Sequence, residues 1–328
     1  MDCDHSSSER LRARIQELEN ELESFKNGER QRLATGRTAS ATPPAVSLLP
    51  ISPSLTHMLL LSDSALPIGS FAYSSGLESF LMHQKQKTTI ANTISLFKDN
   101  FLPLSIHSFC HTTVPYVLSA FENPLDLEEL DNDLDASTPC TVARRASISQ
   151  GRALLAVWSK AFSSSVRRDI IQQNHVNHPR EGNAADTNSN PNDDGDGGID
   201  DAALALDKFA HALKLAAISP PSVWPSVNGH LAPLWGCMCK ALGLSLQETA
   251  YLFVFNHAKG IISAAVRASV MGPYMAQMIL ASDQLERSIR HTLERVWFLS
   301  PDEATQVVPS IDLWLGRHEM LYSRIFNS

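Results

Sequence analysis

The sequence predicts an all-α protein, in the form of a single compact multi-helix domain with a disordered insertion. Apolar residues recur every three or four positions through most of the chain from about Leu48 onward, which is the period of an amphipathic helix. We find no Val- and Ile-rich alternating segment typical of strands, and no convincing internal repeat. With 328 residues, of which 43% are hydrophobic, the chain can bury a large core.

Residues 1–47 are interpreted as an N-terminal appendage, and the helical domain is expected to span 48–328. Two heptads of apolar residues are followed at 34–47 by a small, polar linker that contains Pro43 and Pro44. Two heptads are marginal for a free helix in water, so a weak coiled coil and a frayed, solvated helix both remain open. The heptad positions are Leu11, Ile15, Leu18, Leu22 and Phe25.

The first informative block of the domain is Leu66-Pro67-Ile68-Gly69, which predicts a turn between two helices. Pro67 fixes its own backbone and keeps Leu66 extended, and Gly69 allows a turn that side chains would forbid. Ser74 or Ser75 is expected to cap a helix that begins near Gly76, with Glu78 placed favourably in its first turn.

Helical periodicity then predicts a series of helices, with a kink or break at Pro103 in the first of them. The expected helices are 89–109, 147–162, 202–218, 231–242, 245–271 and 273–298.

Two segments depart from this pattern. The acidic region near 122–140 is expected to be a mobile insertion with a short helix. The region near 172–200 is rich in Asn, Asp and Gly and has almost no apolar residue, so it is expected to be a disordered insertion in the helical domain. Such an insertion is tolerated because loop-closure entropy grows only slowly with length.

The C-terminus, 309–328, stays apolar almost to its last residue, whereas most protein ends are polar and fray. Leu321, Tyr322, Ile325 and Phe326 lie close to Arg317 and Arg324. Such a tail either docks on the core of its own chain or is held for a partner, and the local sequence does not separate the two.

Composition narrows the function classes. The formal net charge is −8 and no basic patch stands out, so we expect no nucleic-acid partner. An odd number of cysteines, five, favours a reducing compartment. We see no signal-like N-terminus and no apolar stretch of membrane-spanning length, and therefore expect a cytoplasmic protein without a membrane partner.

The search for catalytic chemistry gives one weak candidate. The chain has neither a Gly-x4-Gly-Lys-Ser/Thr phosphate loop nor a Gly-x-Ser-x-Gly elbow. His230, Cys237 and Cys239 form the alternative, a small helical enzyme or a metal-binding protein. Two helical residues with one residue between them point about 200° away from each other, which favours buried thiols. We expect no catalytic residue, no bound metal and no cofactor.

The motifs together resemble the urease accessory protein family UreF. The resemblance rests on Leu66-Pro67-Ile68-Gly69 through Glu78 at one end and on Arg317-His318-Glu319 through Phe326 at the other. Weaker blocks lie between them, at Ser147–Leu155, Gly229–Gly236 and Ser263–Arg267.

This resemblance implies an all-helical, non-catalytic scaffold of urease maturation. UreF proteins dimerise, bind UreD (also called UreH) and recruit the GTPase UreG, and the assembly delivers nickel to apo-urease while GTP turnover is modulated. By position in this sequence, the surface toward UreG and the dimer partner is expected at Gly69, Phe71, Tyr73, Gly76, Glu78 and Arg267. The residues expected to hold UreD are Arg317, His318, Glu319, Tyr322, Arg324 and Phe326. A further hypothesis is a helical interaction adaptor that works through the heptad segment.

Overall fold

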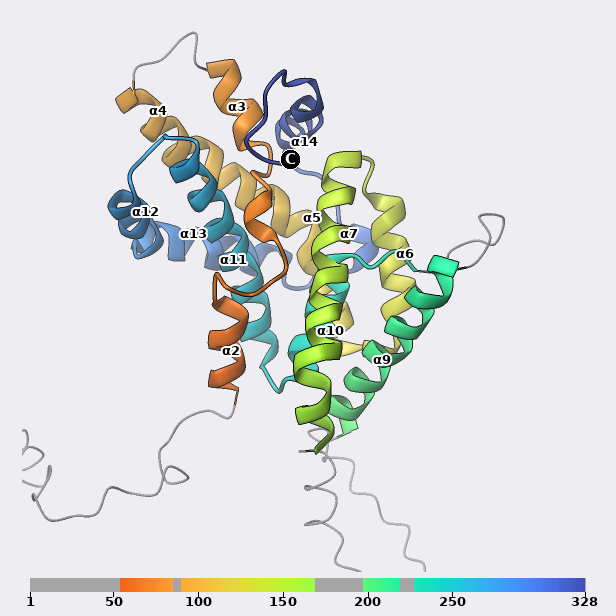
Figure 1. Cartoon of the computed structure of the whole chain (residues 1–328). Coiled ribbons are helices and arrows are strands. Elements are labelled where there is room, and N and C mark those ends of the chain that lie inside the picture. Colours follow the sequence, from red (N-terminus) through yellow and green to blue (C-terminus); the bar gives the residue numbers. More distant parts are fainter. Residues whose placement is uncertain (1–53, 85–89, 169–196, 219–226, 328) are drawn as a thin grey trace, which may run out of the picture. The chain divides into compact units, whose positions relative to one another are not determined.

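Helices build the part of the chain that the structure describes, and no strand occurs in these residues. The structure, a computed structural model, describes residues 54–84, 90–168, 197–218 and 227–327, all within one unit, Pro53–Ser328 (Figure 1). The all-α prediction is therefore confirmed. The appendage 1–47 and most of the insertion near 172–200 lie outside the described residues. Within the described ranges, no helix has the length and apolar character needed to cross a bilayer.

Longer helices are joined by short 3₁₀ turns, and two of them are continued by π-helical turns at Phe97–Phe101 and Trp158–Phe162. The helices are α2 (Leu55–Ser62), α3 (Leu77–Gln84), α4 (Ile90–Leu96), α5 (Leu102–Glu122), α6 (Leu127–Ser137), α7 (Thr141–Val157), α9 (Gly197–Ile218), α10 (Leu231–Ala241), α11 (Leu246–Arg267), α12 (Pro273–Leu280), α13 (Asp283–Val296) and α14 (Pro309–Arg317).

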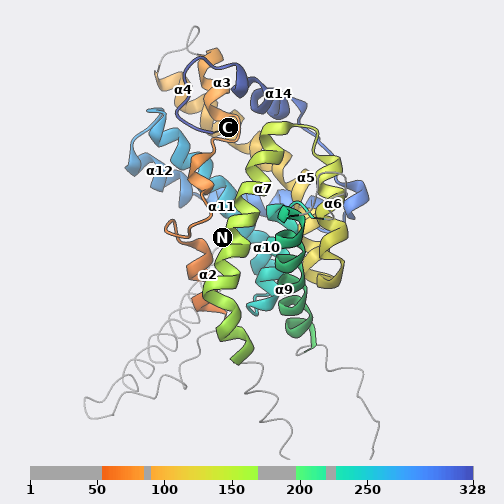
Figure 2. The same ribbon diagram turned by 45° about the vertical axis from the view of Figure 1, so that its right-hand side comes forward.

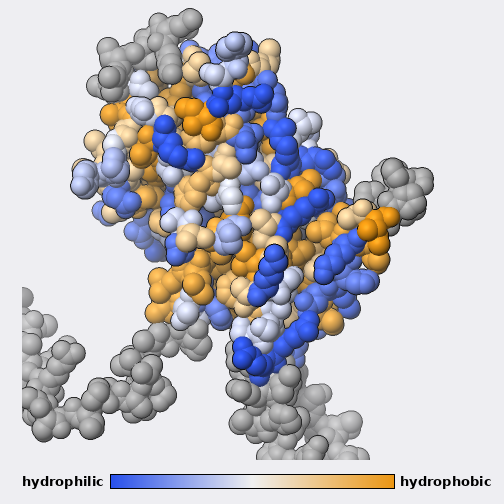
Figure 3. Space-filling model, viewed as in Figure 1, coloured by the Kyte–Doolittle hydropathy of each residue, from blue (hydrophilic) through white to orange (hydrophobic). Residues whose placement is uncertain are grey.

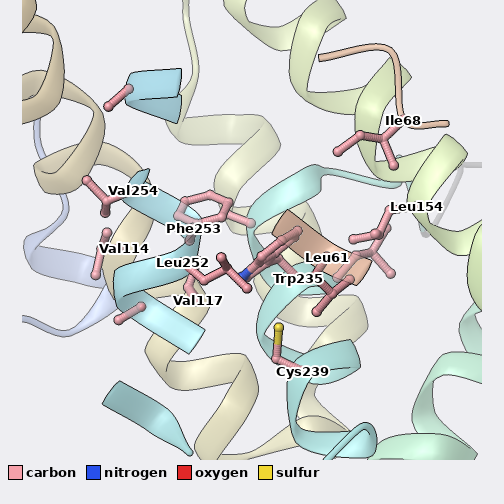
Figure 4. Packing of buried hydrophobic residues seen from close by; sticks show 14 of the residues in the cluster. Leu61, Ile68, Val114, Val117, Leu154, Trp235, Cys239, Leu252, Phe253 and Val254 are labelled. Carbon is pink, nitrogen blue, oxygen red and sulfur yellow. The ribbon is translucent and has the colours of Figure 1, made fainter. Parts of the chain in front are cut away.

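The central element is α5, which packs against α10, α11 and α13 (Figures 1 and 2). Trp235 of α10 and Phe253 of α11 are buried together beside α5, with ring centroids 5.8 Å apart (Figure 4). A Cβ atom at Gly236 would lie 2.1 Å from the carbonyl oxygen of Val117, so α10 can cross α5 this closely only at a glycine.

A proline inside α5 ties a distant loop to this helix. Pro115 has no N–H group, which leaves the carbonyl of His111 without its helical donor. The backbone N–H of Thr305 donates to that carbonyl instead, at 3.2 Å. The kink or break expected at Pro103 corresponds to the π-helical turn Phe97–Phe101, which lies just ahead of this proline.

The stretch 273–298 forms two helices, whereas the periodicity predicted one. Helix α12 ends at Leu280, and Ser282 begins α13 by accepting a hydrogen bond from the backbone N–H of Leu285 at 3.3 Å. A complete capping box starts α11, where Ser245 and Glu248 satisfy each other's backbone N–H groups.

The structure also differs from the expectation of a mobile insertion near 122–140. Helix α6 occupies this region and is packed, because Leu127, Leu130 and Leu134 lie on one face and are buried. Asp131 on the same helix is fully buried as well. The other acidic residues of this region, such as Glu128, Glu129 and Asp133, form the outer face of an amphipathic helix.

Candidate functional site

Residues 62–78, here called the head segment, form a turn-rich connection between α2 and α3. Gly69 and Gly76 have φ angles of +71° and +84°, a region that favours glycine, so the predicted role of Gly69 in the turn is confirmed. Ser74 is the predicted cap: its Oγ accepts a hydrogen bond from the backbone N–H of Glu78 at 3.3 Å. The chain just before the head is held by Asn256, whose Nδ2 donates to the carbonyl of Leu61 at 3.0 Å.

Residues 309–327, here called the tail, return to this head segment and dock on it. A Cβ atom at Gly76 would lie 3.1 Å from Cβ of Trp314, so α14 packs directly against the start of α3. The Trp314 ring lies edge-on to Phe80 at 5.7 Å and tilted against His83 at 5.0 Å. Of the two fates left open for the tail, the structure therefore has it docked on its own chain (Figure 1).

The buried carboxylate of Glu78 is the centre of this contact, which we call the tail clasp (Glu78, His318 and the backbone of 325–327). Glu78 accepts hydrogen bonds from the backbone N–H groups of Ile325 at 2.7 Å and Phe326 at 3.2 Å. His318, also fully buried, places Nε2 3.0 Å from Oε2 of Glu78. The N–H of Asn327 donates to the carbonyl of Ala72 at 2.8 Å. The side chain of Glu78 thus holds the tail at two places, at His318 and at the backbone of Ile325 and Phe326.

An arginine covers the apolar end of the clasp. The guanidinium of Arg267, at the end of α11, lies 4.5 Å from the ring centroid of Phe326 and 6.0 Å from that of Phe71. Burial lowers the pKa of Arg267, which nevertheless remains a cation at neutral pH, and the contact is a cation–π interaction with two rings. Arg267 thus joins the head segment to the tail.

A charged rim surrounds the clasp on its outer side. Glu319 lies 2.5 Å from the guanidinium of Arg145 on α7 and 3.0 Å from that of Arg324. The hydrogen bond from Arg145, and then the charge of Arg145 and Arg324, lower the pKa of Glu319. These ion pairs are therefore present above the usual pKa of a glutamate and are lost as the pH falls through the lowered value. Arg317 donates to Nε2 of His83 at 3.1 Å.

Apolar side chains near the end of the tail point into solvent instead of into the clasp. They belong to Met320, Tyr322 and Ile325, which are 83%, 107% and 65% exposed. Apolar surface also gathers over α2, where Leu59 and Leu60 are exposed, whereas hydrophilic side chains gather over α7 and α9 (Figure 3). Exposed apolar residues beside a charged rim are typical of a protein-binding surface.

The structure brings most of the predicted site residues into this one surface, although the sequence divided them between two. Phe71, Gly76, Glu78, Arg267, Arg317, His318, Glu319, Arg324 and Phe326 take part in it, and Tyr322 projects from it. Gly69 stands apart on the exposed turn, and Tyr73 lines a cavity beneath the head segment. Sequence reasoning missed His83, Arg145 and Trp314, which carry no motif of their own.

The cavity beneath the head segment has a volume of about 350 Å³ and lies between this segment, α5 and α11. Its lining includes His257, which stacks on Phe109 at 3.8 Å and lies 3.2 Å from the hydroxyl of Ser105. Burial lowers the pKa of His257 to about 3, so this imidazole is neutral at physiological pH. A neutral, hydrogen-bonded histidine here is a packing residue with one polar contact.

The alternative site at His230, Cys237 and Cys239 is wrong. Both ring nitrogens of His230 are used, with Nδ1 3.0 Å from Oγ of Ser147 and Nε2 3.0 Å from Oδ1 of Asp135. Cys237 donates to the carbonyl of Ala202 at 3.4 Å, and burial raises the pKa of both thiols, which makes them poor nucleophiles and ligands. Among the described residues, no three His, Cys, Asp or Glu side chains form a metal-binding group.

These observations define an all-helical protein in which the head segment and the tail join in one partly exposed surface. The family model described as UreF matches residues 99–284 of the chain. A protein of Schizosaccharomyces pombe named "Uncharacterized urease accessory protein UreF-like" is 35% identical over 274 residues, which cover 83% of this chain and 97% of that protein. Urease accessory protein 6 of Cryptococcus neoformans is 26% identical, with 86% and 99% covered. Urease accessory protein F of Arabidopsis thaliana is 25% identical, with 82% and 90% covered.

The chain therefore belongs to the UreF family of urease accessory proteins.

Proposed function

We propose that this protein is a non-catalytic scaffold of urease maturation, acting in the cytoplasm, which bridges UreD and the GTPase UreG. In this role it enables nickel delivery to apo-urease and modulates GTP hydrolysis by UreG. The observation that carries the proposal is the docked tail. The tail clasp fixes the backbone of 325–327, so the exposed side chains beside it are held ready for a partner at little further entropic cost.

We assign UreD binding to the exposed side of the tail. Met320, Tyr322 and Ile325 offer apolar contact area, and an exposed tyrosine is a frequent energetic centre of interfaces. The rim formed by Arg145, Glu319 and Arg324 surrounds it with charges of both signs. His318 and Phe326 are buried, so they support this surface from beneath and do not touch the partner.

We assign UreG binding, and the contact with a second copy of this chain, to the head side of the same surface. Gly69 is exposed, and Phe71 lies under the guanidinium of Arg267. Arg267 keeps donors on its outer edge, where it is available to a carboxylate or phosphate. Because head and tail touch, binding of UreD on one side can set the geometry that UreG meets on the other.

A pull-down with purified UreD and UreG tests this proposal. We expect Tyr322→Asp to weaken UreD binding at least tenfold, because a charge would be desolvated at the centre of the interface. Thermal stability is expected to stay unchanged, since Tyr322 has no buried contact. Wild-type protein with UreD is expected to retain UreG in the presence of nickel and GTP.

The matched control is Phe298→Asp, which introduces the same charge at another aromatic side chain that is 91% exposed. This variant is expected to bind UreD as the wild type does. Equal UreD binding by Tyr322→Asp and wild type would contradict the assignment of the tail. Failure of the wild-type complex to retain UreG would contradict the bridging role.

A further inference from the structure

We propose that His107 and His111, a pair on α5, bind a divalent transition-metal ion through their two Nε2 atoms. Residues four apart on a helix lie above one another on the same face. The ring centroids of His107 and His111 are 4.2 Å apart, and their ring planes make an angle of 32°. Imidazole pairs prefer borderline ions such as Ni²⁺, Cu²⁺ and Zn²⁺. The site is separate from the tail clasp.

The hydrogen bonding of His111 prepares it as a ligand. Its Nδ1 donates to the carbonyl of His107 at 2.9 Å, which leaves the lone pair on Nε2 free. Metal-binding histidines commonly donate their second ring nitrogen to a backbone carbonyl, because this bond fixes both the tautomer and the ring orientation. The backbone of His111 is itself held by Thr305, so the ligand stands on a rigid part of α5.

Helix α13 packs along α5 and supplies the remaining groups around the pair. His291 is exposed on α13 and close enough to His107 to interact with it electrostatically. Arg295 on the same helix is a cation that opposes an incoming dication. The described residues hold no preassembled three-ligand group, so the site is a two-histidine site that takes its further ligands from solvent.

Calorimetric titration of the untagged full-length chain with NiCl₂ tests the proposal. We expect one site in the wild type, with an affinity at least tenfold lower in His107→Ala and in His111→Ala. Arg295→Gln is expected to bind Ni²⁺ more tightly, because a repelling charge is removed. The matched control is His211→Ala on α9, an exposed histidine with no second histidine beside it, which is expected to bind as the wild type does.

Thermal unfolding with and without Ni²⁺ gives a second readout that is independent of the calorimeter. Nickel is expected to raise the melting temperature of the wild type and of His211→Ala, and not that of His111→Ala. An unchanged isotherm in His111→Ala, or no site in the wild type, would overturn the proposal. A variant that unfolds without metal is replaced by His111→Gln, which keeps the helix and removes the ligand.

Discussion

Replacing Glu78 by alanine is expected to release the tail, with hydrogen exchange at the amides of Ile325 and Phe326 accelerated by about a hundredfold or more. Both amides donate to the Glu78 carboxylate, and His318 is buried against it. Removing one member of a buried, charged hydrogen-bonded group costs about 3–5 kcal/mol, since the donors left behind are desolvated and unpaired. The tail is terminal, so it can escape this cost by detaching into water.

Two features of this expectation separate it from general destabilisation. Amides in α5 and α11 are expected to keep their protection, because they open only with the core. The matched control is Glu294→Gln on α13, where an exposed glutamate is replaced, and it is expected to leave tail exchange unchanged. Slow tail exchange in the Glu78 variant would show that the clasp does not hold the tail.

Replacing Asp131 by alanine is expected to lower the free energy of unfolding by about 3–5 kcal/mol. Asp131 is fully buried in α6, and its carboxylate accepts the backbone N–H groups of Gly229 at 3.0 Å and His230 at 2.6 Å. The N–H of Asn228 donates to it as well, at 2.5 Å. Without the carboxylate, the segment that leads into α10 keeps buried donors that no water can reach, and the whole core must loosen to hydrate them.

Chemical denaturation measures this loss, and a second aspartate on the same helix supplies the control. Asp133 is exposed, so Asp133→Ala is expected to change the free energy of unfolding by no more than about 0.5 kcal/mol. Asp131→Asn is expected to lose part of this stability, because its amide oxygen still accepts two of these bonds whereas its NH2 group faces the N–H groups that the second carboxylate oxygen had bound. A loss below about 1 kcal/mol for both variants at Asp131 would contradict this account of the α6–α10 junction.

The helical class and most of the helices followed from the sequence, because apolar period, caps and breakers are local signals. The sequence predicts a mobile insertion with a short helix at 122–140, because the region is acidic, whereas the structure has the packed helix α6 there. A buried Asp131 has the same local sequence signature as a solvated one, and its partners lie about a hundred residues away, at 228–230. The break between α12 and α13 was missed for a simpler reason: Ser282 is a small polar residue that helices also tolerate in their interior.

The sequence motifs indicated the two segments that form the candidate site, but not how these segments contact each other. The head and tail motifs marked Glu78 and His318, yet nothing local in either motif predicts a hydrogen bond across 240 residues. Arg145 lacked any motif, and only the folded chain places it against Glu319. The side chains that face solvent, such as Tyr322, also required the structure, because the tail pattern did not distinguish docked residues from presented ones.

The central claim is that the tail must be docked on the head segment before it can bind a partner. The most direct test is the affinity of UreD for the Glu78→Ala variant, because Glu78 is buried and cannot itself touch UreD. The account predicts at least tenfold weaker binding once hydrogen exchange has shown the tail to be released. Asp133→Ala, which leaves the clasp intact, is predicted to bind as the wild type does. Unchanged UreD affinity in a variant with a released tail would contradict the account.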